Sequence, residues 1–548
     1  VIGSGGAGCQ AAYAAADKGS KVLLISKDPI SSSDTKISEG IATVRDASDD
    51  EDAEEVLSEN IKMAGGDLPL TEITDVFAKD SKLAYDRYRT HGLRPSINTS
   101  KKGPQALPLP MGGHNRSRSV GHKNSGIAFG HANWDSIIKN KGIDYLEDSW
   151  FLELVTEDDI VNNDQVKSIV GGIIYDAARG VIIAVSSPSI VIAAGGLSTL
   201  YFPKTDTMRG NTGDSYACAL RAGANLVDME QIQFLPFCIA SPPSYEGLLA
   251  GEPVTASFLG VLRDKNGKII LDGVYLRTRA ECSSAIMRAV EDGRGSPNGG
   301  AYLDMTANKK APRSGKYFMK FLETCLPSAY VNARQAMGKE AAKVEKPWEV
   351  RPSAHYCMGG LSVNKEGSSF LEFSKDHKEK GIKGLFAAGQ AMGGLFGANR
   401  LGSTSLTELA VFGYRAGSAA HERSKNIKLK VNKQNFLKYI SDVKNKFGQE
   451  GKIHASLLKI KIQKESWNNI GPIRSLERLK KMDNFLNSIE KQLNNISIPN
   501  YSLWNQSFLE FWELRNMIDT AKAITAAARE RDGSLGGHVR LDCGNIFI

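Results

Sequence analysis

The hydrophobic positions at the start of the chain form short apolar runs on either side of an alanine-rich segment. Val1 and Ile2 end one run, residues 9–18 have a helical composition, and residues 22–25 form a second continuous run. Continuous apolar runs of this length are typical of buried parallel strands. A glycine turn at residues 3–8 separates the first run from the helix. The pattern predicts strand, turn, helix and strand, which is the opening of an α/β fold.

Later segments contain further predicted strands and a second glycine-rich region, and the end of the chain is predicted to be helical. Apolar residues predict strands at 166–175, paired as a hairpin with 180–185, and at 189–194. A second glycine-rich region covers residues 384–417, and after residue 423 Leu, Ile and Lys recur at helical spacing. We expect one nucleotide-binding domain of the doubly wound type, interrupted by an α+β insertion and followed by helices. The predicted boundaries are 1–234 and 351–423 for that domain, 235–350 for the insertion, 424–530 for the helices and 531–548 for a tail.

Composition narrows the function classes. The 548 residues are 41% hydrophobic and 24% charged, which is ordinary for a globular protein, whereas 54 glycines are more than average usage gives. The net charge of +8 does not indicate nucleic acid, and no apolar stretch is long enough to span a membrane. Seven dispersed cysteines without a CxxC pair argue against an iron–sulfur site, and we predict no metal site. These features fit a cytoplasmic protein; peripheral attachment to a membrane complex stays open.

The first glycine turn has the GxGxxG spacing of a dinucleotide-binding loop. Gly3 permits the tight turn, Gly5 lets backbone N–H groups approach a pyrophosphate, and Gly8 lets helix and strand pack closely. The alternative is a purely structural turn. An acidic ribose ligand is expected about 20 residues further on. The second strand instead ends in Ser26, which is able to serve the ribose; Asp28 is a weaker substitute.

The second glycine region predicts a strand, a loop and a helix that begins at Thr404 or Ser405. The N-terminus of such a helix stabilises negative charge on a reduced flavin ring. The alternative is a glycine-rich packing loop. Two glycine-rich turns in one chain suit an extended cofactor, and we therefore predict FAD.

These motifs, taken together, resemble a known family. Besides the two glycine regions, the chain carries Glu39-Gly40, 211–214, 228–230 with Gln233-Phe234, His-Tyr-Cys-Met-Gly-Gly at 355–360, Ala388-Gly389, Gly-Ala-Asn-Arg-Leu-Gly at 397–402, Ser405-Leu406, 467–474 and Gly537-His538. They occur in the order seen in the flavoprotein subunit of fumarate reductase and succinate dehydrogenase. Relatives are L-aspartate oxidase and the alpha subunit of adenylylsulfate reductase. The last is the weaker match, because the 397–402 motif belongs to the dicarboxylate branch.

The resemblance implies a reaction and a set of site residues. The family moves a hydride between FAD and a CH–CH group of an organic acid. His355 and Arg400 match its carboxylate-binding positions, and Arg279 aligns with its proton-donating arginine. A core histidine and a surface ion pair are the alternatives for His355 and Arg279. The positions expected to contact FAD are Gly3, Gly5, Gly6, Gly8, Ser26, Lys27, Ser38, Glu39, Gly40, Ala194, Asp214, Gln390, Arg400, Ser405 and Leu406.

One departure from the family concerns flavin attachment. Membrane-bound members carry a covalent flavin on a histidine, and that position is Asp34 here. A carboxylate does not form the histidyl bond, so we expect non-covalent FAD. In the family, loss of the bond usually favours alkene reduction, and we therefore favour the reductive direction.

A second departure concerns the substrate. The family's carboxylate-binding histidine of the QFHPT motif is Leu235, and its Thr-Glu pair and its Arg and Glu proton relay are not recognisable around residues 254–258. The alternatives are fumarate or succinate, a larger or monocarboxylated 2-enoate or another substrate as in adenylylsulfate reductase, and a flavin subunit that chiefly relays electrons.

The sequence also leaves open which protein or small molecule exchanges electrons with this chain. Without cluster ligands of its own, the chain must exchange electrons with a partner, and the family implies an iron–sulfur subunit. Residues 425–491 hold 16 Lys and Arg against 6 Asp and Glu. This basic segment is either a solvated face or a docking surface for a more acidic partner.

Overall fold

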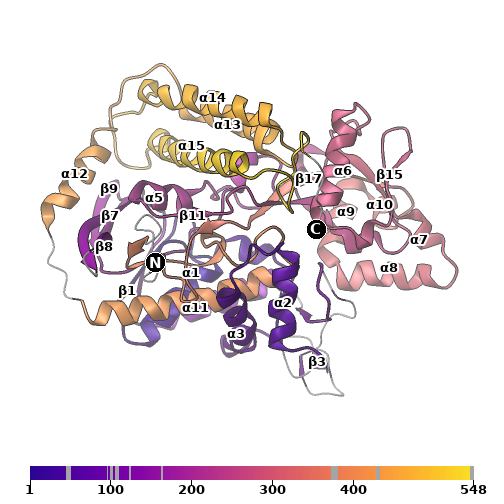
Figure 1. Ribbon diagram of the computed structural model, residues 1–548, viewed down its shortest axis with the longest axis horizontal. Helices are drawn as coiled ribbons and strands as arrows, with labels where there is room; N and C mark the ends of the chain where they lie inside the picture. The colour runs from indigo at the N-terminus through magenta and orange to yellow at the C-terminus, as the bar shows by residue number, and fades with distance from the viewer. Residues whose placement is uncertain are drawn as a thin grey trace.

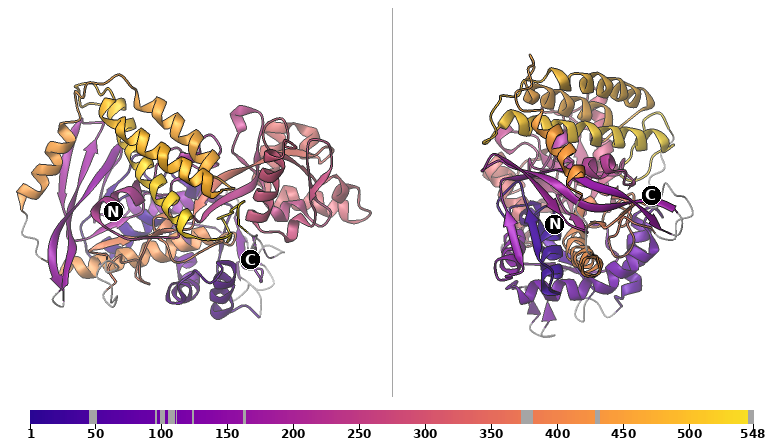
Figure 2. Two further views of the ribbon diagram at one scale, coloured as in Figure 1. Left: turned by 45° about the horizontal axis from the view of Figure 1, so that its top comes forward. Right: turned by 90° about the vertical axis from the view of Figure 1, so that its left-hand side faces the viewer.

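The computed structural model describes residues 1–44, 51–94, 97–98, 103–104, 110, 112–122, 125–161, 164–371, 381–427 and 432–543. Three parts are visible: a mixed α/β body, a second lobe on the right and a layer of helices along the top (Figure 1). The second lobe stands out from the body when the molecule is turned (Figure 2). The predicted architecture of a doubly wound domain, a capping domain and a helical domain is confirmed.

The body is built around short parallel strands. Its elements up to the insertion are α1 (Gly6–Asp17), β1 (Val22–Ile25), β2 (Gly40–Ala42), α2 (Glu54–Ala64), α3 (Thr71–Thr90), β3 (Ile97–Asn98), β4 (Gly103–Pro104), β5 (Ser119–Gly121), α4 (Ser125–Ile138), β6 (Ile143–Leu146), β7 (Ser149–Val161), β8 (Asp164–Asp176), β9 (Val181–Ser186), β10 (Ile190–Ile192), α5 (Asp214–Ala222) and β11 (Leu226–Val227). After the insertion follow β18 (Gly360–Leu361), β19 (Ile382–Lys383), β20 (Leu385–Ala387) and α11 (Thr404–Lys425).

The strand order brings the two glycine regions together. β1 pairs in parallel with β6, β10 pairs in parallel with β20, and Ile2 bridges Ile25 on one side and Ile192 on the other. The first predicted strand is therefore a single bridging residue. Because carboxyl ends of parallel strands meet at one edge of a sheet, the turns after Ile2 and β20 share that edge.

Helix α11 lies along α1 because glycines remove the side chains between them (Figure 1). A Cβ at Gly413 would lie 2.5 Å from the Ala7 carbonyl oxygen, and one at Gly417 would lie 2.1 Å from that of Ala11. Both are closer than side-chain atoms approach backbone. This close packing fixes the second glycine loop beside the first.

The predicted hairpin forms the outer sheet of the body. β8 pairs antiparallel with β9, as expected, and on its other edge with the long strand β7. Helix α12 (Lys433–Lys444) covers this sheet through Phe436, whose ring faces Gly171.

The inserted lobe has its own sheet and its own core. Its elements are β12 (Ile232–Ile239), β13 (Leu249–Gly251), β14 (Val261–Arg263), β15 (Ile269–Leu271), α6 (Arg279–Glu291), β16 (Ala301–Asp304), α7 (Thr306–Lys310), α8 (Ser314–Cys325), α9 (Pro327–Met337), α10 (Lys339–Ala342) and β17 (Trp348–Cys357). The six strands run in the order β13-β12-β17-β16-β14-β15. A separate buried cluster around Trp348 spans Phe237 to Val350. Strands β12 and β17 cross the predicted boundaries at 234/235 and 350/351, and they connect the lobe to the body.

The helical layer consists of α13 (Ala455–Ile470), α14 (Leu476–Lys491) and α15 (Gln506–Glu530), which pack on one another. Their apolar residues join the core of the body, so the layer has no separate core. None of the helices in the described ranges combines the length and apolarity that crossing a membrane requires.

Candidate functional site

A cavity of about 1240 Å³ lies between the body and the inserted lobe. It is lined by both glycine regions, by the end of β1, and by residues 248–254 and 324–332 of the lobe. Pockets for single small ligands measure roughly 300–1,000 Å³. This cavity is therefore large enough for a dinucleotide and a small second ligand.

The first glycine turn has the geometry that a pyrophosphate requires. Gly3 has φ +97°, and a Cβ there would lie 2.2 Å from the carbonyl oxygen of Ala193. Gly5 is the N-cap of α1 and provides no side-chain cap; the first amide of the helix, that of Gly6, donates to the Thr35 hydroxyl across 3.0 Å, and Gly5, Gly6 and Ala7 line the cavity. A Cβ at Gly8 would lie 1.8 Å from the Gly3 carbonyl oxygen. Gly3, Gly5 and Gly6 line the cavity, whereas Gly8 acts by helix–strand packing.

The end of β1 supplies a serine and a lysine. The Ser4 hydroxyl donates to the Ser26 Oγ across 2.8 Å. Lys27 Nζ lies 2.6 Å from Asp214 Oδ2 and donates to the Gly210 carbonyl across 3.0 Å. Ser26, Lys27 and Asp214 all line the cavity. The buried lysine is thus positioned by a carboxylate on the first turn of α5.

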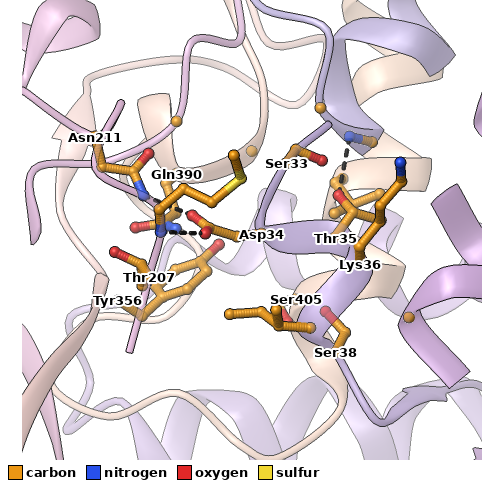
Figure 3. A pocket seen from close by; sticks show the side chains of 18 of the residues that line it. Ser33, Asp34, Thr35, Lys36, Ser38, Thr207, Asn211, Tyr356, Gln390 and Ser405 are labelled. Atoms are coloured by element: carbon orange, nitrogen blue, oxygen red, sulfur yellow. Dashed lines mark hydrogen bonds between the residues drawn. The ribbon is translucent and has the colours of Figure 1, made fainter. Parts of the chain in front are cut away.

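Asp34 lines the cavity and accepts two hydrogen bonds. The Met208 N–H donates to Oδ1 across 2.8 Å, and the Asn211 amide donates to Oδ2 across 2.6 Å. Figure 3 shows the Asn211 and Asp34 side chains pointing at each other. Burial raises the pKa of Asp34, while the two donors oppose this shift. Asp34 is fixed as a carboxylate acceptor on the wall of the cavity.

The second glycine region brings the N-terminus of α11 to the cavity. The N-cap Ser403 has φ +61° and makes no side-chain cap. Ser405 and Gln390 line the cavity, and the Gln390 Oε1 accepts from the Cys357 N–H across 3.1 Å. Leu406 is fully buried and is not a lining residue. Only its backbone, in the first turn of α11, is oriented with the helix dipole.

Two buried carboxyl groups in this region titrate at unusual pH. Burial raises the pKa of Glu408 to about 8, although the Gly389 N–H donates to its Oε1 across 2.8 Å. Burial also raises the pKa of Glu39 to about 7, against a hydrogen bond from Ser328 of the lobe. Glu39 lines the cavity together with its neighbours Ser38 and Gly40 and with Ala194. A proton therefore remains on Glu408 at neutral pH.

Arg400 is held by a side chain from β12. Gln233 Oε1 accepts from the Arg400 Nε and Nη2 across 3.1 and 2.9 Å, and the guanidinium lies 4.9 Å from the Tyr356 ring centroid. Burial, with the nearby Arg279, lowers the pKa of Arg400 to about 10. Arg400 lines the cavity as a buried cation oriented by a neutral amide.

Arg279 lies directly behind the wall that Arg400 forms. It is the first residue of α6, where Thr278 and Glu281 form a capping box. Its Nη1 donates to the Arg400 carbonyl across 2.9 Å, and its Nη2 pairs with Glu252. Nε has no hydrogen-bond partner among the described residues. Arg279 is not a lining residue, but its ion-pair partner Glu252 is. Glu252 therefore lies between Arg279 and the cavity.

Sequence reasoning missed Glu252. The family's acidic relay residue was not recognisable around residues 254–258, and the structure places Glu252 just before them, at the N-cap of a short 3-10 helix. Burial favours the neutral form of Glu252, but the neighbouring Arg279, Arg400 and His355 outweigh it and lower the pKa of Glu252. One signal was present, because Glu252 is the only Asp or Glu between residues 247 and 263.

His355 reaches the same end of the cavity from β17. Its Nδ1 lies 2.8 Å from Asp206 Oδ2, and both residues line the cavity. The carboxylate favours the tautomer with hydrogen on Nδ1 and leaves Nε2 for another partner. No sequence pattern marked Asp206, because the pairing joins residues 149 positions apart. The structure thus brings His355, Arg400 and Arg279 together, with two carboxylates that were not expected.

The C-terminal tail packs against the 397–402 loop, on the side away from the cavity. The Gly537 N–H donates to the Ala398 carbonyl across 3.0 Å, and a Cβ at Gly536 would lie 2.0 Å from that oxygen. His538 Nδ1 lies 2.8 Å from Arg474 Nη1 and is fully buried. His538 does not line the cavity. Residues 544–548 of the predicted tail lie outside the described residues.

Comparison with known proteins decides the family. The family described as "FAD binding domain" matches residues 1–406, and "Fumarate reductase flavoprotein C-term" matches residues 459–545. The chain belongs to the fumarate reductase and succinate dehydrogenase flavoprotein family. The prediction from the motifs is confirmed. FAD is the cofactor, and the family's reaction class is oxidoreduction at CH–CH groups.

Individual relatives cover nearly the whole chain. A fumarate reductase (CoM/CoB) chain of Methanothermobacter marburgensis is 28% identical over 99% of this chain and 93% of its own length. A quinol-fumarate reductase structure with menaquinol matches at 25% identity and TM-score 0.85, covering 100% of this chain and 92% of that one. Adenylylsulfate reductase of Archaeoglobus fulgidus shares the fold at 17% identity and TM-score 0.71, covering 100% and 90%.

Proposed function

We propose that this chain is the flavoprotein subunit of a reductase that saturates the carbon–carbon double bond of an organic acid with non-covalent FAD. The observation that carries the proposal is the cluster of Arg279, Glu252, Arg400 and His355 at one end of the cavity. The cluster combines buried cations, which bind a carboxylate, with an ion pair able to move a proton.

The residues around the cavity fit FAD. When bound, FAD supplies a hydride to the substrate carbon. The N-terminus of α1 would hold the pyrophosphate, Ser26 would bind the ribose, and the N-terminus of α11 would face the flavin ring. We also assign FAD contacts to Lys27, Asp214, Glu39, Gln390 and Ser405, whereas Gly8 and Leu406 act through their backbone and packing.

Arg400 and His355 bind the carboxylate of the substrate in this proposal. Gln233 fixes the guanidinium plane of Arg400, and Asp206 fixes the ring of His355. Binding a carboxylate against these donors withdraws electron density from the double bond. The carbon further from the carboxylate then becomes the better hydride acceptor.

We assign to Arg279, as the family resemblance implies, the proton for the neighbouring carbon. The guanidinium does not itself line the cavity, but its Nη2 lies directly behind Gly112 and Gly402, which do. Arginine is a weak acid, with an ordinary pKa above about 12, so it needs immediate reprotonation. Glu252 is paired with Arg279 Nη2 and lines the cavity, which makes it the group that returns the proton. One hydride and one proton add across the double bond, and the product is the saturated acid.

The flavin is held without a covalent bond. Asp34 stands where covalent members have histidine, and both its oxygens accept hydrogen bonds from Met208 and Asn211. Acid precipitation should release the yellow chromophore into the supernatant. Colour that stays with the precipitated protein would contradict this assignment.

Electrons come from a partner subunit. The relatives' names describe them as subunits of larger enzymes, and the family resemblance implies an iron–sulfur protein as the donor. The dispersed cysteine pattern provides no cluster ligands in this chain. Purification of the native complex should therefore recover an iron–sulfur protein in stoichiometric amount. A chain that is isolated alone and is fully active with a soluble donor would argue against this partner.

The test of the proposed function is reoxidation of the reduced flavin. The purified holoprotein is reduced with dithionite without oxygen and mixed with a panel of 2-enoic acids, beginning with fumarate. We expect at least one acid to reoxidise the flavin and to appear as its saturated product. Reoxidation by none of them would favour a subunit that only relays electrons.

A further inference from the structure

The two ends of the substrate region differ in charge and polarity. His355 at the end of β17 and Arg400 of the second glycine region are the basic side chains here, whereas the lining residues between 235 and 332 are mainly apolar. The apolar lining residues on that side are Leu235, Leu248, Leu249, Val254, Leu326 and Val331. This distribution bears on which acid the site accepts.

The cations of the site are largely paired already. Glu252 pairs with Arg279, and Asp206 pairs with His355. Arg400 contacts Gln233, the Leu401 carbonyl and the Ser405 hydroxyl, all of them neutral groups. Among the described residues it has no carboxylate within ion-pair distance. One cation is therefore left to be balanced by a ligand, and one carboxylate balances it.

The described lining residues of the lobe between 235 and 332 include no cation that could pair with a second carboxylate. In its described part, the only charged lining residue is Glu252, which repels an anion. The Asn332 amide donates to the Leu249 carbonyl across 2.8 Å, and the Ser328 hydroxyl bonds to Glu39. Transferring a carboxylate from water to such a wall costs more than any remaining contact returns.

Leu235 lies where a second polar contact would be expected. It follows Gln233 by two residues on β12, so both side chains face the same side of the strand. Gln233 uses that side to hold Arg400, and Leu235 lines the cavity while only 1% of its surface is exposed. The strand that holds Arg400 through Gln233 therefore also presents an apolar, closely packed side chain to the cavity.

We infer that the substrate is a 2-enoic acid with a single carboxylate, whose apolar substituent on the far carbon lies against the lobe. The inference rests on the proposed function and names its substrate class. Arg400 and His355 hold the carboxylate, and the apolar wall takes the tail. The relatives' substrate, as their names give it, has two carboxylates, so this chain would differ from them in specificity.

Two measurements on the holoprotein test the inference. The first is the affinity of the oxidised holoprotein for (E)-2-hexenoate and for fumarate, measured from the change that each acid causes in the flavin absorption spectrum. The second is the rate of reoxidation of the reduced flavin by the same two acids. Because one apolar contact is worth about tenfold and an unpaired carboxylate more, hexenoate should exceed fumarate at least about tenfold in both. Equal values, or a preference for fumarate, would overturn the inference.

Leu235→His sharpens the test, with Leu235→Met as the matched apolar control. The histidine adds a hydrogen-bond donor beside Arg400, so the preference should move towards fumarate by at least about tenfold. The methionine variant should keep the order of the wild type. A histidine variant with the wild-type ratio would count against the inference. If that variant lacks flavin, the wild-type ranking still decides.

The failure of this inference differs from failure of the proposed function. Reoxidation by fumarate in preference to hexenoate leaves a working reductase with a different substrate. If no acid of the panel reoxidises the flavin, the reductase assignment fails, and the ranking of the two acids on the oxidised protein still decides between one and two carboxylates.

Discussion

The nucleotide end and the acid end of the cavity are built in different ways. At the nucleotide end, the first glycine turn and the following helix supply one continuous stretch of chain, residues 3–17. At the acid end, Asp206, Glu252, Arg279, His355 and Arg400 come from five separate segments. The first depends on local backbone geometry, and the second depends on how the lobe sits on the body.

This difference predicts different responses to mutation. A change at the nucleotide end should remove the cofactor, because backbone atoms form the binding surface. A change at the acid end should leave the cofactor in place and affect the reaction, because side chains from both the lobe and the body form that surface. The following experiments test this separation, beginning with the largest expected effect.

Replacement of Arg279 by alanine should cause the largest loss of turnover. Proton transfer by a positioned group contributes about 10²–10⁴-fold, so we expect a fall in turnover of about 10³-fold with flavin content unchanged. Arg277→Ala is the control, because this arginine pairs on the surface with Asp272 and Glu281. Flavin absorbance and the steady-state rate are measured together. Wild-type turnover in Arg279→Ala would remove the proton-donor assignment.

Replacement of Gly3 by alanine should break the nucleotide end. The added Cβ would lie 2.2 Å from the Ala193 carbonyl oxygen at φ +97°, and we expect a cost of about 3 kcal/mol with loss of bound flavin. Gly19 is the matched control: it has φ +101° but nothing within 4 Å of its Cβ position. Gly19→Ala carries the backbone strain without the clash and should keep its flavin. Equal flavin content in the two variants would contradict the close-approach argument.

Replacement of Glu252 by glutamine should slow the reaction by about 10²-fold, or roughly 2.7 kcal/mol, because Arg279 loses the carboxylate that reprotonates it. The matched control is Glu291→Gln, which removes the carboxylate of an exposed pair with Arg478. The pH dependence of the rate separates the roles. A variant with a lower rate and an unchanged pH profile would indicate that Glu252 only positions Arg279.

Glu408 should make stability depend on pH. Its pKa is raised in the fold to about 8 from an ordinary 4.5, so its protonated form is favoured by folding. This contribution is complete below about pH 4.5 and is lost as pH rises through 8. Between pH 5 and 7 the flavin-free wild type should lose about 2 kcal/mol relative to Glu408→Gln. Thermal unfolding across this range measures it, and parallel curves for the two proteins would refute it.

The nucleotide end and the acid end of the cavity also differ in how far the sequence predicts them. Gly3, Gly5 and Ser26 were predicted from spacing, because a tight turn between strand and helix has a short, recognisable signature. Arg279, His355 and Arg400 were predicted only through resemblance to a family. Glu252 and Asp206 were missed, since nothing in the local sequence of either residue shows which cation it pairs with.

The sequence by itself determined the parallel βαβ opening, the two glycine turns, the FAD cofactor and the order of the three parts. It determined them because local backbone requirements and apolar periodicity are properties of neighbouring residues. Only the tertiary structure decided that Gln233 holds Arg400, that Glu252 stands between Arg279 and the cavity, and that Leu235 closes the remaining space. Those contacts join residues far apart in the chain, and they depend on the packing of the inserted lobe against the body.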